Sequence, residues 1–181
     1  MSKNSSKSKT KMLCVAAVFA AMYVGLDYLS TAISSFSGGT MKLSLSGLPV
    51  IIAAILLGPV WGAAVGFVGA FVGQMISYGF TATTLLWVLP AVVRGLSVGL
   101  LYIAFKRSEK IYILTVEVVI SALLVTAFNT LAMYIDTVVY KYSMAIFGMA
   151  LVNRVIAAVV TSVVFAVILP PILKALRKVI K

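Results

Sequence analysis

The sequence contains no histidine, a single cysteine (Cys14) and only four acidic residues among 181. Without histidine the chain lacks the commonest general base and metal ligand. One cysteine excludes a disulfide framework and a cysteine-cluster metal site. No Gly-rich loop ending in Lys-Ser/Thr is present, so a phosphate-binding P-loop is excluded. With no nucleophile–base set either, the composition argues against an enzyme.

Charged residues are also scarce, at 10% of the chain against about 25% in a soluble domain, whereas hydrophobic residues reach 62%. This balance predicts an integral membrane protein with no soluble domain, so any ATPase activity must come from a partner. We predict an all-α fold, a compact bundle of six transmembrane helices over residues 12–173. The predicted spans are 12–36, 41–58, 59–78, 84–105, 111–138 and 145–169.

Two features qualify the ends of these spans. The second span is short for a bilayer and contains Gly47 and Pro49 near its start, so we expect an irregular end that is shielded by protein. Pro170-Pro171 is expected to end the sixth span. Residues 1–11 are predicted to be a disordered basic tail, and residues 174–181 a basic amphipathic tail.

The basic residues predict the orientation. Eleven Lys and Arg fall in the two tails and in residues 106–110, which six spans place on one side of the membrane, whereas only Lys42 and Lys141 fall in loops on the other side. The positive-inside rule then places both termini in the cytoplasm. We expect a multi-pass protein of the bacterial cytoplasmic membrane. This distribution accounts for most of the net charge of +11 without a nucleic-acid partner.

Arg94 is the most informative residue. No charged side chain occurs in the 51 residues between Lys42 and Arg94, and Arg94 itself lies inside a predicted span. A charge there costs a few kcal/mol and by default marks a functional site. At about 1.5 Å per residue, other polar side chains reach a similar layer of the membrane. With Arg94, the predicted substrate-binding residues are Gln74, Tyr78, Thr83, Thr84, Trp87, Asn129, Asn153 and Arg154.

Structural explanations compete with this prediction. Asn129 and Gln74 also suit helix–helix hydrogen bonding, and Trp87 and Tyr78 also suit interface anchoring. Other residues invite structural explanations as well: an Arg154–Asp27 ion pair, and interfacial or structural roles for Asp136 and Glu117.

The charge balance favours a ligand. Two arginines and one deep acid, Asp27, leave one positive charge in the layer, which an anionic ligand would balance. A carboxylate fits the guanidinium fork well.

Small residues in the first span form a second pattern. Ala16, Ala20, Ala21 and Gly25, together with Ala17, recur at four-residue spacing. Such a stripe lets another helix approach closely, either within the bundle or from another membrane subunit.

These features resemble the S component of an energy-coupling factor (ECF) vitamin transporter, most of all the group of folate and pantothenate binders. The resemblance is carried by the basic tail, the Ala-x-x-x-Ala first helix, and the segments SGLPVIIAAILLGPVWGAAVGFVGAFVGQMISYG and TTLLWVLPAVVRGLSVGLL. It implies a vitamin site near the outer face, with residues 34–45 as a lid. It also implies that Ala16, Ala20 and Ala21 contact a transmembrane coupling (T) subunit, and that two cytoplasmic ATPases bind ATP and Mg²⁺ while this chain holds no cofactor. In the family mechanism the loaded S component topples in the membrane.

The threonine-rich segment 78–84 departs from the aromatic- and glycine-rich segment of folate S components. We therefore expect a smaller ligand with hydroxyl groups, pantothenate, whose carboxylate would bind Arg94. Pyridoxine, hydroxymethylpyrimidine and folate remain alternatives, as does a stand-alone proton-coupled carrier.

Overall fold

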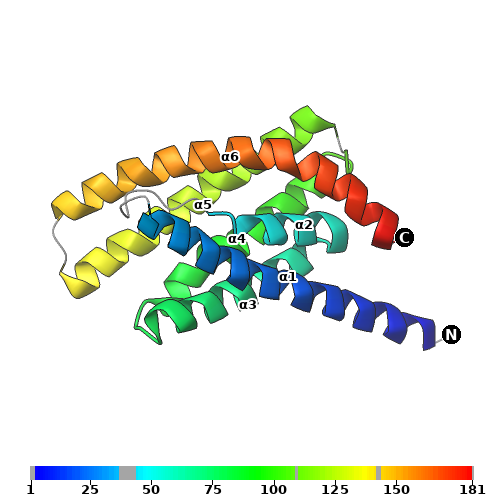
Figure 1. The fold of residues 1–181 in the computed structure, drawn as a ribbon, viewed down its shortest axis with the longest axis horizontal. Coiled ribbons are helices and arrows are strands. Elements are labelled where there is room, and N and C mark those ends of the chain that lie inside the picture. The colour runs from blue at the N-terminus through cyan, green and yellow to red at the C-terminus, as the bar shows by residue number, and fades with distance from the viewer. Residues whose placement is uncertain (1–2, 37–43, 109, 142–143, 181) are drawn as a thin grey trace.

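The computed structural model describes residues 3–36, 44–108, 110–141 and 144–180. All regular secondary structure within these ranges is α-helical. In chain order the helices are α1 (Lys3–Phe36), α2 (Gly47–Leu57), α3 (Pro59–Tyr78), α4 (Thr84–Ala104), α5 (Ile111–Tyr140) and α6 (Met144–Ile180) (Figure 1). Five of them, all except α2, are long and apolar enough to cross a membrane. The chain is therefore a multi-pass membrane protein, as the composition predicted.

Helix α3 matches the predicted third span at both ends. Gly58 and Gly79 flank it with φ angles of 104° and 70°, in the region that glycine adopts without a steric cost. Pro59 stands at the first helical position, where its missing N–H and fixed φ favour a helix start.

Helix α2 has only 11 residues and does not cross a membrane, so the expected span of 41–58 is wrong in length. Residues 44–46 precede it without helical structure, and residues 37–43, which include most of the expected lid, lie outside the described part. The expected shielding is confirmed, since α2 packs against α1, α3, α4 and α6 and Val50 and Ala53 are fully buried. An apolar helix surrounded by others can end inside a bundle because lipid does not reach its ends.

Helices α1 and α6 are longer than predicted. Residues 3–11, expected as a disordered tail, continue α1, because adding residues to an existing helix carries no nucleation cost. Pro170 and Pro171 lie inside α6 rather than ending it. Prolines are tolerated within membrane helices where neighbouring groups satisfy the freed carbonyls.

Glycines set the contact between α3 and α4. A Cβ atom added at Gly66 would collide with the backbone carbonyl of Ala91, and one at Gly95 would collide with the backbone of Gly62. The two backbones thus touch directly, a close approach that small residues allow in membrane helices.

The bundle has two distinct ends, and both chain termini lie at the same one, the terminal end (Figure 1). The core near this end brings Leu169 and Leu173 of α6 together with Ile51 and Ile55 of α2 and Phe19 of α1. Within the described residues the backbones of α1 and α6 do not come close to each other, and α2 packs against both. The opposite end carries residues 79–83 and Lys141.

Candidate ligand-binding cavity

A cavity of about 820 Å³ lies within the bundle, and its lining reaches residues at the end opposite the termini, among them Thr83 and Tyr140. It falls within the 300–1,000 Å³ range of small-molecule sites. All six helices contribute to its walls. The polar and aromatic residues that line it include Tyr23, Asp27, Ser46, Gln74, Tyr78, Thr81, Thr83, Trp87, Arg94, Ser121, Thr126, Asn129, Asp136, Tyr140, Asn153, Arg154, Thr161, Ser162 and Phe165.

The structure brings the predicted substrate-binding residues together with one exception. Thr84 does not line the cavity. It is buried at the start of α4, where its hydroxyl oxygen accepts the backbone N–H of Thr81 at 2.8 Å. A threonine that satisfies the loop before a helix has no free group for a ligand, so we correct its assignment to a structural one. Asn153 and Tyr78 are exposed at the rim.

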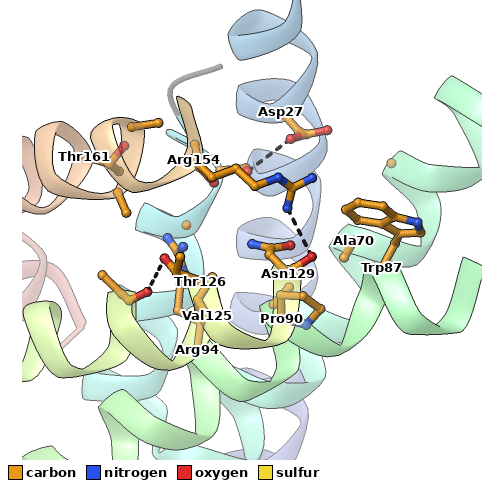
Figure 2. A pocket seen from close by; sticks show the side chains of 18 of the residues that line it. Asp27, Ala70, Trp87, Pro90, Arg94, Val125, Thr126, Asn129, Arg154 and Thr161 are labelled. Atoms are coloured by element: carbon orange, nitrogen blue, oxygen red, sulfur yellow. Dashed lines mark hydrogen bonds between the residues drawn. The ribbon is translucent and has the colours of Figure 1, made fainter. Parts of the chain in front are cut away.

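Arg94 projects into the cavity from α4, and its guanidinium points toward α6 (Figure 2). Its guanidinium carbon lies 5.9 Å from the ring centroid of Phe165. Among the described residues its guanidinium forms no hydrogen bond and no ion pair. A side chain at Gly47 would occupy the same space as this guanidinium, so the glycine provides room for it. The five N–H donors of Arg94 are thus available inside a pocket.

Arg154 enters from α6 and stacks on Trp87, with 5.1 Å between the guanidinium carbon and the ring centroid. It also donates a hydrogen bond of 3.4 Å to the backbone carbonyl of Asn129 (Figure 2). No Arg154–Asp27 ion pair forms among the described residues. Asp27 instead accepts a hydrogen bond from the Ser46 hydroxyl at 3.3 Å. The alternative of a structural Arg154–Asp27 pair is therefore wrong.

Asp136 was not predicted as a site residue but lines the cavity. It accepts a 2.6 Å hydrogen bond from Thr83 and so ties the start of α4 to the end of α5. The cavity therefore holds two arginines and two aspartates, and their formal charges cancel. The excess positive charge that the sequence predicted for a ligand is therefore too large, because Asp136 joins Asp27 in this layer. Asp136 lies seven residues, or two helical turns, after Asn129. This spacing places both on one face of the helix and could have identified Asp136 as a lining residue.

Tyr23 is a second lining residue that the sequence argument missed. It stands four residues from Asp27 on the same face of α1 and lies within electrostatic reach of both Asp27 and Arg94. The four-residue spacing from Asp27 was the signal.

The predicted docking stripe on α1 needs a correction. Ala16 and Ala20 are 6% and 8% exposed, in the bundle's own core, so they are not available to another subunit. Ala17, Ala21 and Gly25 are exposed instead. Adjacent helical rows differ by about 100° in direction, so rows 16/20 and 17/21 cannot both face outward.

The comparisons with known proteins now decide the family. A family model described as "ECF-type riboflavin transporter, S component" matches residues 7–178, which is nearly the whole chain. The chain belongs to this family. A search of curated proteins finds no match. The predicted ECF S component is confirmed, and such a component is a substrate-binding transporter subunit rather than an enzyme. S components of this kind work with a T subunit and ATPase modules. The match does not single out the folate and pantothenate group.

Proposed function

We propose that this S component captures a small water-soluble vitamin in the cavity at the outer face and delivers it inward with a T subunit and two ATPase subunits. The observation that carries the proposal is the cavity itself, in which Arg94 offers its donors without a protein partner among the described residues. A buried guanidinium with unused donors is costly in a membrane, and a ligand acceptor would offset that cost. In this proposal ATP and Mg²⁺ are bound by the partners.

We propose riboflavin as the ligand. The name of the matching family supports it, and so does the charge balance of the cavity, because two arginines against two aspartates suit an uncharged ligand. Trp87 and Tyr23 supply aromatic surface for a flavin ring. Carboxylates such as Asp27 and Asp136 accept hydrogen bonds from the hydroxyl groups of a ribityl chain.

Riboflavin binding can be measured directly. Purified protein is expected to quench the fluorescence of riboflavin by placing the ring beside Trp87. Trp87→Leu should weaken binding about 2- to 10-fold, because an aromatic pair is worth about 0.5–1.5 kcal/mol beyond its buried area. Trp61→Leu is the matched control, since Trp61 lies outside the cavity, and its affinity should not change. An absence of quenching by the unmodified protein would argue against riboflavin.

Pantothenate is the second candidate, and the unpaired guanidinium of Arg94 is the observation that favours it. A carboxylate would form a bidentate pair there. Its amide and hydroxyl groups would reach Gln74, Thr83, Asn129 and Asn153, which line the same cavity. Native mass spectrometry of the purified protein distinguishes the two, because a retained vitamin is identified by its mass.

We also propose that both termini face the cytoplasm of a bacterial cell. The basic residues at the terminal end support this orientation. On a Cys14→Ser background, Lys110→Cys should react with a membrane-impermeant maleimide only after cells are opened. Lys141→Cys should react on intact cells, since both lysines are exposed at opposite ends of α5. The reverse pattern would invert the proposed orientation and place the cavity on the inside.

A further inference from the structure

Glu117, in the second turn of α5, is a buried carboxylate without a hydrogen-bond partner among the described residues. It is 0% exposed, and both of its carboxylate oxygens lack a hydrogen bond. Its neighbours Leu114 and Val118 on α5 belong to the apolar core. An ionised carboxylate that is taken out of water without a partner is strongly disfavoured. Something must neutralise this group.

Arg94, the charged residue of the neighbouring helix α4, lies too far away to do so. The Ser97 hydroxyl donates to the Ser121 hydroxyl at 3.0 Å, which fixes the register of the antiparallel helices α4 and α5. Glu117, four residues before Ser121, is then level with Leu101. Arg94 is seven residues beyond Leu101, about 10 Å along the helix axis at 1.5 Å per residue.

The other surroundings of Glu117 carry no compensating charge. Tyr102 is the titratable residue of α4 in the same core. The core positions of α6 are Phe165, Leu169 and Leu173, and α2 contains no titratable residue. Glu117 is therefore neutralised from outside the chain as far as the described residues show.

A layer of hydroxyl groups lies between Glu117 and the cavity. Ser121 lines the cavity floor one turn above Glu117, and Ser97 is hydrogen-bonded to it. The Arg154–Asn129 hydrogen bond sets the register of α6, which brings Thr161 level with residue 122. The Thr161 hydroxyl is buried, lines the cavity and has no partner. By this register Thr161 lies about five residues, roughly 7 Å along the bundle, from the level of Glu117, between the carboxylate and the rest of the cavity.

We propose that Glu117 binds a monovalent cation, a proton or Na⁺, below the floor of the cavity. Glu117 itself does not line the cavity, but Val118 next to it and Ser121 one turn away do, so a cation from the cavity would pass these residues to reach the carboxylate. A proton would convert the carboxylate into a neutral acid, whereas Na⁺ would pair with the carboxylate directly. This site does not depend on which vitamin the cavity binds.

Thermal stability of the detergent-purified full chain tests the proposal. For Na⁺ the melting temperature of the unmodified protein should rise as NaCl replaces choline chloride at constant ionic strength and pH. For a proton it should rise as the pH falls in choline chloride, because the folded state holds the neutral acid. Glu117→Gln, an uncharged isostere, should be at least as stable and should lose that response. Asp136→Asn is the matched control and should keep it, because Asp136 lines the cavity mouth rather than its floor.

Two results would overturn the inference. One is an unmodified protein whose melting temperature responds to neither cation. The other is a response that Glu117→Gln retains in full. If Glu117→Gln does not accumulate, the unmodified protein still decides the matter. Calorimetric titration with Na⁺ and the infrared band of a buried protonated carboxyl group must then show one of the two forms, and the absence of both refutes the site.

Discussion

Gly95→Ala is expected to destabilise the protein by about 3 kcal/mol, the upper part of the usual range for overpacking. The added Cβ would collide with the backbone carbonyl of Gly62, and neither helix backbone can move without disturbing the rest of the α3–α4 contact. For a chain of this size the loss corresponds to a fall of roughly 6–12 °C in melting temperature. Fluorescence-detected size exclusion of heated samples measures it.

Gly25→Ala is the matched control for this prediction. Gly25 lies in α1 with no atom within 4 Å of an added Cβ, and it is exposed. Its replacement should leave the melting temperature unchanged or raise it, since alanine favours a helix over glycine by about 1 kcal/mol. Equal losses in the two variants would show that close packing is not the reason for Gly95.

Arg94→Gln is expected to weaken vitamin binding about 100-fold, because a hydrogen bond to a charged group is worth about 1.5–3 kcal/mol. Glutamine keeps some polarity but loses the charge and the fork of five donors. Since no described residue depends on the guanidinium for a hydrogen bond or ion pair, the melting temperature should fall little or even rise. Fluorescence or calorimetric titration gives the affinity.

Arg94→Lys and Gly47→Ala separate charge from geometry. Lysine retains the charge without the fork, so its effect should be smaller than that of glutamine. Gly47→Ala retains Arg94 but displaces its guanidinium, and it should also weaken binding. An affinity of Arg94→Gln within threefold of the unmodified protein would remove Arg94 from the binding site.

The parts of the fold that follow from local chemistry were predictable. Gly58-Pro59 and Gly79 determine both ends of α3, because they restrict the backbone at those points. The layer of polar residues around Arg94 was also predictable, since a polar group inside a membrane span must face protein or water rather than lipid. Depth along each helix was enough to bring Arg94, Asn129 and Arg154 together.

The rest depended on contacts between helices. Which face of α1 turns inward decides whether Ala16 or Ala17 is exposed, and the stripe contains small residues on both faces. Whether Pro170 ends a helix depends on how neighbouring groups satisfy its freed carbonyl. Asp136 lines the cavity although it was expected to be structural, whereas Thr84 does not line it. The loop between α3 and α4 decides both outcomes, because it pairs Thr83 with Asp136 and Thr81 with Thr84.

The separation of the α1 and α6 backbones within the described residues bears on how a ligand could enter the cavity. Among the described residues α2 is the helix that packs against both α1 and α6, whose own backbones do not come close to each other. Moving α1 and α6 apart would break no hydrogen bond within either helix, because each helix forms its backbone hydrogen bonds internally. We therefore expect any opening on this side to be a rigid movement of whole helices rather than the unwinding of one.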